Sequence, residues 1–393
     1  MRYWRRNACL KMRRKKIERG KAMTQLPEIL YRGSVKDIRA GFEKDDLIFQ
    51  FSDRYSVFDW GEMPDILPEK GAALAMLAWL FFDLLKQRGI NSHMNALLDQ
   101  NGAILSGDDI FTHKTPLLSV EKMDVLRPAE KSENGKLSFD YSAYDTKPAG
   151  CLVPLEVIFR YAVPEGSSLL KRAGDADYCK SLGLDTPPKA GDVFTAPVIE
   201  FSTKLENYDR YLTYDEAQKI SGMNDAEFSK LQQQMKTAAA TLHGIFAEIG
   251  IDLLDGKLEF GFAKETDAEG NRDFVLIDSI GPDELRLSYN GTQLSKEVLR
   301  KFYRGNNWEQ AVEKAKKLAD QRGIADWKTI CVDELQQTPP VLDPALKTAT
   351  AMIYKSIARA LAEKFYQKSC FDNAWPLKDV AATLDNWGKK HAA

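Results

Sequence analysis

Residues 251–287 constrain the fold most, because they hold two apolar segments joined by a charged turn. In residues 257–262, Leu258, Phe260 and Phe262 alternate with polar or small residues. A period of two places the apolar side chains on one face of a strand and the others on the opposite face. We therefore expect a half-buried strand here, followed by a solvent-exposed turn and a second strand.

The second strand of this expected hairpin covers residues 274–277 and ends at Asp278. Pairing the two strands could bring Asp278 close to Glu259. Two such carboxylates repel each other and are costly to bury. A divalent cation removes that cost, and nucleotide-bound Mg²⁺ takes one or two protein carboxylates together with phosphate oxygens. The spacing alone fits a magnesium site and a surface hairpin with solvated acids about equally well.

The composition is that of a soluble globular protein of about two domains. The chain has 393 residues, of which 44% are apolar and 28% charged. No apolar run approaches the roughly 20 residues that span a bilayer. The five cysteines lie far apart without a CxxC pair, and the four histidines show no metal-ligand spacing. The cysteine spacing favours a reducing compartment and argues against a zinc or disulfide framework.

The first 22 residues differ in charge from the rest of the chain. They carry ten Lys or Arg residues and one acid, which leaves 45 basic and 56 acidic residues elsewhere. Such a tail could bind nucleic acid or an anionic membrane. It lacks the long apolar core of a secretory signal. We favour translated sequence upstream of a start at Met23, and expect residues 1–26 to be a disordered tail.

The first candidate nucleotide site is a turn near residue 33. Residues 30–33, 36–40 and 46–52 are predicted strands, and a buried or amphipathic helix is expected over 70–88. Gly33 would let the backbone approach a phosphate, and Lys36 would supply a positive charge. An isolated Gly-x-x-Lys is also what an ordinary hairpin contains.

A second candidate site follows residues 150–163, an apolar strand interrupted by Glu156 and Arg160. Isolated charges in so apolar a run usually have partners or ligands. The sequence EGSSLLKR that follows supplies a Gly-Ser turn and two cations, which suit a phosphate ester or, equally, a helix start. The polar residues 128–149 before the strand are predicted to be a loop or insertion.

The second half of the chain is predicted to be mainly helical around the central hairpin. Thr213 and Glu216 form a capping box for a helix beginning at Tyr214. Apolar residues recur at intervals of three and four over residues 227–249, which predicts one long helix. Further helices are expected near 294–304, 307–322, 345–368 and 377–387, where we see packing elements and no chemistry.

Eight segments in consistent order, from about residue 28 to 305, also carry a family resemblance. They are YRGSVKD, SDRYSVFD, LPEKG, GINSHM, VPLEVIFRYAVPEGSSLLKR, STKLENYDR, DGKLEFGF and IDSIGPDELR. Together they resemble the SAICAR synthetases, the phosphoribosylaminoimidazole-succinocarboxamide synthases. The resemblance implies an α+β two-domain fold related to ATP-grasp, with ATP between the domains and extra C-terminal helices. The implied reaction joins carboxyaminoimidazole ribotide (CAIR) to L-aspartate at the expense of ATP.

The same resemblance implies roles for single residues. The catalytic residues would be Lys257, Asp255 and Lys204, and the metal ligands would be Glu259 and Asp278. ATP would be bound by Gly33, Ser34, Lys36, Glu156 and Lys204. The ribotide and the amino acid would be bound by Arg160, Ser167, Arg286, Asp209 and Asp283. The choice of Ser167 over Ser168 stays open, because the spacing from Arg160 is one residue longer than in the family.

Three departures from the family pattern concern substrate choice more than ATP binding. Ser34 stands where the family usually has lysine, Ser279 where it has glutamate, and Gly281 where it has serine or threonine. The alternatives are a divergent kinase or amide ligase for another substrate, or a non-catalytic nucleotide-binding relative. The retained Arg286 argues against a kinase, and the retained Glu259 and Asp278 argue against a non-catalytic protein.

The resemblance also implies an organisation and a setting for the chain. We expect a β-rich nucleotide-binding domain over residues 27–155, an α+β substrate domain over 156–305 and a helical extension over 306–393 packed on the second domain. The expected ligands are ATP, Mg²⁺, CAIR and L-aspartate. The expected location is the cytoplasm, with no membrane or nucleic-acid partner and with a homo-oligomer as an open option.

Overall fold

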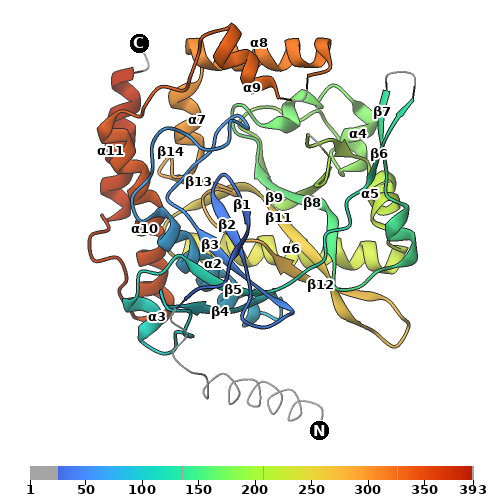
Figure 1. Ribbon diagram of the computed structural model, residues 1–393, viewed down its shortest axis with the longest axis horizontal. Coiled ribbons are helices and arrows are strands. Elements are labelled where there is room, and N and C mark those ends of the chain that lie inside the picture. The colour runs from blue at the N-terminus through green and yellow to red at the C-terminus, as the bar shows by residue number, and fades with distance from the viewer. Residues whose placement is uncertain (1–24, 134–135, 207, 325, 392–393) are drawn as a thin grey trace.

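The computed structural model describes residues 25–133, 136–206, 208–324 and 326–391 (Figure 1). The expectation of a basic tail therefore falls almost wholly outside the described residues. The first sheet is antiparallel, with its strands in the order β1-β2-β3-β5-β4. Its strands are β1 (Ile29–Arg32), β2 (Lys36–Ala40), β3 (Asp46–Phe51), β4 (Met94–Leu98) and β5 (Leu117–Glu121). The first three confirm the strands predicted from the sequence.

The second sheet is built around one long strand, β11, which contains the first half of the predicted hairpin. One edge of β11 pairs with β8, and the other edge pairs first with β13 and then with β12. The strand order across the sheet is β10-β9-β8-β11-β13-β14, and β12 pairs with β11 beside this path. The bounds are β8 (Leu152–Ala162), β9 (Val193–Thr203), β10 (Tyr211–Leu212), β11 (Asp252–Thr266), β12 (Arg272–Ile277), β13 (Leu285–Tyr289) and β14 (Thr292–Gln293). The predicted central hairpin is confirmed as β11 and β12.

Two helices pack between the sheets and join them. Helix α2 (Lys70–Lys86) contacts strands β3, β4 and β5 of the first sheet and also helix α6 (Asp225–Ala247), which covers the second sheet. Their junction is apolar, with the rings of Phe81 and Phe246 5.3 Å apart between centroids. Helix α5 (Tyr214–Ser221) begins at the predicted capping box, because the side chains of Thr213 and Glu216 bond to each other's backbone N–H groups.

The C-terminal helices wrap one side of the molecule and contact both sheets' domains (Figure 1). Helix α10 lies along α2, and α11 contacts α10, β13 and β14. The extension is therefore not confined to the second domain. Helix α7 (Glu297–Tyr303) precedes the extension. The extension contains α8 (Asn307–Arg322), α9 (Trp327–Thr329), the π-helical turn η3 (Ile330–Glu334), α10 (Pro344–Tyr366) and α11 (Leu377–His391). Among the described helices, none is both long and apolar enough to cross a membrane.

The polar segment before β8 differs from the predicted loop. It forms a hairpin of β6 (Ala129–Glu133) and β7 (Lys136–Asp140) and a 3₁₀ turn η1 (Ser142–Thr146). Among the residues that the structure describes, these two strands form a separate two-stranded sheet. The expected domain boundary at residue 155 lies inside β8, all of which belongs to the second sheet. The remaining short helices are α3 (Asp109–Thr112), η2 (Ser168–Lys171) and α4 (Ala176–Ser181).

A buried ion pair between α6 and β12 supports the second sheet and gives a stability prediction. Arg272 donates to both carboxylate oxygens of Glu227 at 2.8 and 3.0 Å, and both residues are at most 1% exposed. We expect Glu227→Gln to lower the free energy of unfolding by about 3–5 kcal/mol, because it leaves a buried guanidinium without its counter-charge. Urea unfolding would measure this loss.

The adjacent exposed pair provides the control for this prediction. Lys230 and Asp273, 3.2 Å apart, link the same helix to the same strand, yet their side chains are 43% and 58% exposed. Asp273→Asn should therefore cost less than about 1 kcal/mol. Burial raises the pKa of Glu227, but hydrogen bonds from Arg272 outweigh this effect and hold the pKa at about 2. The ionised Glu227 should therefore stabilise the fold fully above pH 4.5, and this stabilisation should be lost as the pH falls towards 2. Equal losses for the two variants would contradict the assignment.

Candidate active site

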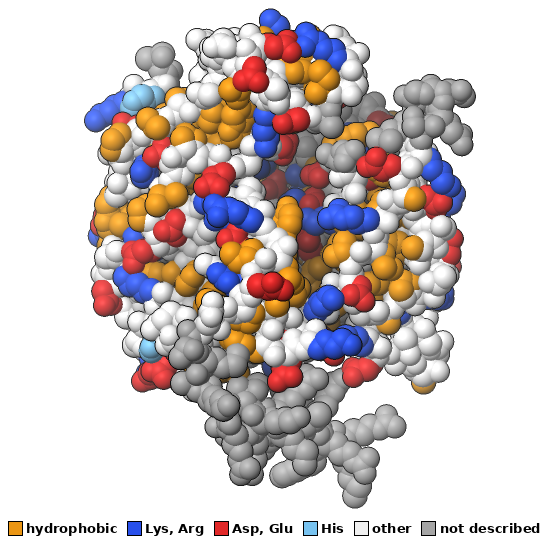
Figure 2. Space-filling view, viewed as in Figure 1, with side chains coloured by type: hydrophobic (Ala, Val, Ile, Leu, Met, Phe, Trp, Pro, Cys, Tyr) orange, Lys and Arg blue, Asp and Glu red, His pale blue; other side chains and the backbone are white. Residues whose placement is uncertain are grey.

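Charged side chains from both sheets meet in a cleft of the molecule. Figure 2 shows this face hollowed near its upper centre, with acidic and basic side chains inside the hollow. The contacts described below bring together the start of β2, the residues directly after β9 and β12, and one face of strands β8 and β11. This cleft contains most of the residues for which the resemblance implied a role.

The turn between β1 and β2 brings Lys36 into the cleft. The Gly33 N–H donates to the carbonyl oxygen of Lys36 at 2.9 Å, and a Cβ on Gly33 would lie 2.6 Å from that oxygen. Only glycine fits so tight a turn, which also contains Ser34. The Lys36 ammonium forms an ion pair with Asp278 and lies 4.4 Å from the centroid of the Phe49 ring. Burial lowers the pKa of Lys36 to about 8, and the charges of Glu259 and Glu284 oppose that effect.

Asp278 lies immediately beyond β12 in an unusual backbone conformation. Glu259 pairs in register with Ile277, so Asp278 follows one position later, as the predicted hairpin requires. Its φ of 64° is left-handed, a conformation that costs energy for a residue other than glycine. The buried imidazole of His93 contacts the Asp278 carbonyl oxygen at 3.2 Å. Burial and the charge of Lys36 lower the pKa of His93 to about 3, so this ring is neutral.

A second group of charges surrounds Glu156, which is 3% exposed. One of its oxygens accepts hydrogen bonds from Lys257 at 2.6 Å and Lys204 at 3.2 Å. Lys204 also contacts Glu259 at 2.5 Å, and Glu259 pairs in register with Glu156. Although burial lowers it, these two carboxylates hold the pKa of Lys204 well above its usual range. Glu156 thus holds the two lysines, and its predicted contact with ATP stays a prediction.

A third group is centred on Asp255. Arg160 on β8 and Arg286 on β13 are its register partners on the two sides of β11. Both guanidinium groups donate to one oxygen of Asp255 at 3.0 Å. Arg160 also donates to Ser167 at 3.3 Å and to Ser168 at 3.0 Å. The structure therefore brings both candidate serines to Arg160.

Glu200 completes this group and was missed in the sequence. It is fully buried on β9, forms an ion pair with Arg160, and accepts hydrogen bonds from Arg172 at 2.6 Å and the Tyr178 hydroxyl at 2.8 Å. Glu200 is a single acid in the apolar run VIEF. The rule that singled out Glu156 and Arg160, an isolated charge in an apolar strand, would have found it.

Two predicted substrate residues lie apart from the arginine group. Asp283 pairs with the buried ammonium of Lys70 at 2.9 Å and accepts a hydrogen bond from Tyr354 of α10 at 2.6 Å, and its predicted contact with substrate stays a prediction. Despite burial, Lys70 holds the pKa of Asp283 at about 2. Asp209 is an exposed residue between β9 and β10. It interacts electrostatically with Glu156, Lys257 and Lys204. Its role stays a prediction.

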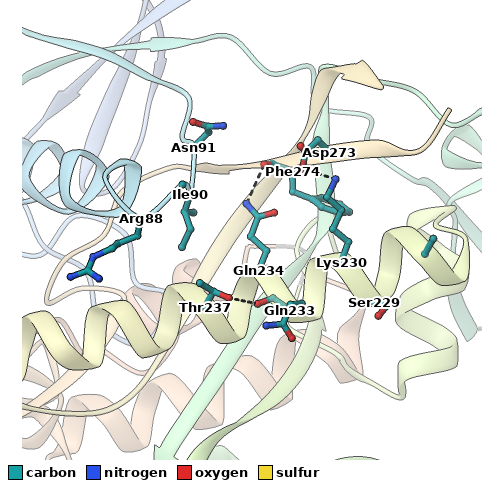
Figure 3. Close-up of a pocket in the computed structure, with 12 residues that line it drawn as sticks. Arg88, Ile90, Asn91, Ser229, Lys230, Gln233, Gln234, Thr237, Asp273 and Phe274 are labelled. Atoms are coloured by element: carbon teal, nitrogen blue, oxygen red, sulfur yellow. Dashed lines mark hydrogen bonds and ion pairs between the residues drawn. The ribbon is translucent and has the colours of Figure 1, made fainter. Parts of the chain in front are cut away.

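A separate pocket lies on the outer side of α6 (Figure 3). It has a volume of about 550 Å³, and residues 88–91, the start of α6 and the first residues of β12 line it. The Gln234 amide donates to the Phe274 carbonyl oxygen at 3.2 Å, and Lys230 pairs with Asp273 along one edge. None of the cleft residues described above lines this pocket, so it is no part of the candidate active site.

The cleft combines the groups that phosphate-transfer chemistry needs. Glu259 on β11 and Asp278 directly after β12 supply hard oxygen ligands, and each is paired with a lysine. Mg²⁺ that brings phosphate oxygens and water as its other ligands fits such a pair of carboxylates. The lysines are then available to bind phosphate oxygens as point charges. Within the described residues, no group of three or more acidic, histidine or cysteine side chains is arranged to hold a metal ion.

Comparison with known proteins agrees with the resemblance seen in the sequence. The family model for SAICAR synthetase matches residues 29–315. An Archaeoglobus fulgidus protein with the provisional name phosphoribosylaminoimidazole-succinocarboxamide synthase is 36% identical over 359 residues, covering 90% of this chain and 98% of its own length. The Thermoplasma acidophilum enzyme of that name is 28% identical over 297 residues, or 74% of this chain and 87% of its own.

The solved structures support the fold. The SAICAR synthase from Saccharomyces cerevisiae, in complex with SAICAR, superimposes with a TM-score of 0.56 and 19% identity, covering 89% of this chain and 99% of the yeast protein. At that identity the match concerns the fold alone. The Archaeoglobus match is longer than the family model, so it takes in part of the C-terminal helices.

Proposed function

This chain belongs to the SAICAR synthetase family, and we propose on that basis that it joins CAIR to L-aspartate using ATP. It is then a carbon–nitrogen ligase of purine biosynthesis that produces SAICAR, ADP and phosphate. The relation of the fold to ATP-grasp enzymes, with ATP between the two sheets' domains, is part of this proposal. A cytoplasmic location is also proposed, supported by four buried free thiols, Cys151, Cys179, Cys331 and Cys370.

The observation that carries the proposal is the order of charges along one face of β11. One face of β11 carries Asp255, Lys257 and Glu259, two positions apart, and each of them has a different partner. Asp255 holds two arginines, Lys257 contacts Glu156, and Glu259 contacts Lys204. We assign the arginine end to the ribotide, the Lys257 position to the reacting carboxylate, and the Glu259 end to the nucleotide phosphates. A ligand that spans this strand would place its carboxylate beside the γ-phosphate.

The chemistry follows from the weakness of a carboxylate as an acylating group. In the first step, a carboxylate oxygen of CAIR forms a bond to the γ-phosphorus, and the bond from that phosphorus to the bridging oxygen of ADP breaks. In the second step, the amine of aspartate forms a bond to the acyl carbon, and phosphate leaves as the nitrogen loses a proton. Lys204 and Lys257 would hold the charged reactants close together, which supplies most of the rate enhancement in phosphoryl transfer.

Glu259 and Asp278 would hold Mg²⁺, which neutralises charge on the phosphates when it is bound. Gly33, Ser34 and Lys36 would cover the phosphates from the first sheet. Asp209 would face the amino acid from the opposite wall. The proposed small-molecule partners are thus ATP, CAIR and L-aspartate, while assembly into a homo-oligomer is left open.

Two departures from the family pattern lie close in sequence to Asp278, one of the two proposed metal ligands. Ser279 is 7% exposed, directly after Asp278. A Cβ on Gly281 would lie 3.1 Å from the Leu74 side chain and 3.7 Å from the Glu284 carboxylate. Ser279 and Gly281 are smaller than the usual family residues, which is compatible with the close packing of α2 against the loop after β12. The chain retains both Glu259 and Asp278.

The test is turnover by the full chain with ATP, Mg²⁺, CAIR and L-aspartate. We expect ADP and the succinyl product to form in equal amounts, and neither to form when CAIR is omitted. ADP production that does not require CAIR, or that yields no succinyl product, would overturn the proposal. Replacing aspartate with glutamate or asparagine would define the amino-acid specificity.

A further inference from the structure

The 3₁₀ turn η1, which follows the β6–β7 hairpin, is fixed firmly to the second domain. Tyr144 in η1 is fully buried, and its hydroxyl donates to the Leu152 carbonyl oxygen of β8 at 3.0 Å. A Cβ on Gly222, which ends α5, would lie 2.2 Å from the Tyr144 carbonyl oxygen, so the turn packs tightly on α5. The inserted segment thus provides a rigid support beside β8 and β9, on the right of Figure 1.

From this support, Tyr141 reaches the chain between β9 and β10. Its hydroxyl donates to one carboxylate oxygen of Glu206 at 3.1 Å. Arg210 donates to the same oxygen at 2.9 Å and to the other oxygen at 3.1 Å. Tyr141 is 8% exposed, and the Glu206 side chain is 1% exposed. A buried carboxylate held by three donors is a strong local constraint on the backbone.

The constrained backbone carries two groups assigned to the active site. Lys204, at the start of the connection, contacts Glu259 and Glu156, and its backbone N–H donates to the Pro154 carbonyl oxygen at 3.1 Å. Asp209 lies directly before Arg210, whose carbonyl oxygen accepts from the Thr203 N–H at 3.0 Å. The Tyr141–Glu206–Arg210 contacts therefore fix the chain on both sides of Asp209, at Glu206 three residues before it and at Arg210 directly after it.

We propose that Tyr141 is a positioning residue for the amino-acid substrate, acting through Glu206 on the backbone that carries Asp209. The inference rests on the proposed function, because it assigns Asp209 to the amine of L-aspartate. A carboxylate beside an ammonium group has to keep its place within a fraction of an ångström to retain a charge-assisted hydrogen bond. Loss of one donor to Glu206 loosens Asp209 more than Lys204, because Lys204 retains its two carboxylate partners and its bond to Pro154.

Tyr141→Phe removes this hydroxyl, and Tyr144→Phe is its matched control. Both variants keep the ring and delete one buried hydrogen bond of the same turn, so they should lose similar amounts of thermal stability. Only Tyr141→Phe should raise the KM for L-aspartate, by about fivefold to tenfold, while the KM values for ATP and CAIR change less than twofold. Glu206→Gln, which weakens the same contacts from the other partner, should show the same selectivity.

Hydrogen–deuterium exchange gives a readout that does not depend on turnover. Amides of residues 208–210 should exchange faster in Tyr141→Phe than in the wild type, and at the wild-type rate in Tyr144→Phe. Equal exchange and an equal KM for aspartate in the two variants would overturn the inference. A wild-type protein without CAIR- and aspartate-dependent turnover would instead overturn the proposed function, while the exchange comparison would still test the positioning by Tyr141.

Discussion

Asp278→Asn should lower kcat by roughly a hundredfold or more, equivalent to at least about 2.7 kcal/mol of transition-state stabilisation. The substitution nearly preserves shape but replaces a hard anionic ligand by a weaker neutral one. Phosphoryl transfer depends on neutralising charge that develops on the phosphates, so chemistry should suffer more than binding. Steady-state turnover at saturating substrates would measure the effect, and higher Mg²⁺ should restore only part of it.

Binding of nucleotide without metal should change little in this variant. Asp278 pairs with Lys36, so the substitution releases a cation that can still bind phosphate. Equilibrium binding of ATP in the presence of a chelator would test this point separately from activity. The result would distinguish a lost metal ligand from a collapsed phosphate site.

Two further variants and one control sharpen the metal assignment. Glu259→Gln should behave like Asp278→Asn, and the double variant should be no slower than either single one if the two carboxylates act as a unit. Asp273→Asn makes the same chemical change five residues earlier, at an exposed site in β12, and should leave kcat unchanged. Near-normal turnover of Asp278→Asn at ordinary Mg²⁺ would refute the assignment of Glu259 and Asp278 to the metal.

Arg286→Ala should raise the KM for CAIR roughly tenfold to a hundredfold and leave the KM for ATP nearly unchanged. Loss of one charge-assisted contact to a phosphate or carboxylate typically costs about 1.5–3 kcal/mol. The cleft should otherwise persist, because Asp255 keeps its contact with Arg160 at 3.0 Å. Initial rates with one substrate varied at a time would separate the two constants.

The controls for this prediction are Arg286→Lys and Arg322→Ala. Lysine keeps the charge but not the planar fork of donors, so it should restore only part of the affinity for CAIR. Arg322 forms an exposed pair with Glu334 on the C-terminal helices, and its removal should change neither constant. An equal rise of both KM values in Arg286→Ala would place Arg286 outside the ribotide site.

Local patterns predicted the elements of this fold well. The capping box at Thr213 and Glu216 fixed the start of α5, and the helix expected near 307–322 matches α8. The alternation in residues 257–262 identified the strand around which the second sheet is built. These features depend on neighbours within a few residues, where hydrogen bonding and amphipathic spacing are set by the chain itself.

The inserted segment, residues 128–149, was not predicted correctly from local sequence patterns. Residues 128–149 are polar and contain no strong apolar period, so the sequence favoured a loop. In the structure, Tyr141 and Tyr144 of this segment are buried against Glu206 and β8. Single aromatic residues in polar surroundings carry no signal of their partners, which lie several to more than sixty positions away.

By itself the sequence determined which residues carry charge on the strands of the second sheet and which strand is central. Only the tertiary structure decided how those charges pair. Asp255 lies between Arg160 and Arg286 because β11 pairs with β8 on one side and β13 on the other. Asp283, only three positions before Arg286, instead meets Lys70 and Tyr354, which α2 and α10 bring to it. Buried charges are costly unless paired, yet the partner is set by register and helix packing across distances that no local pattern encodes.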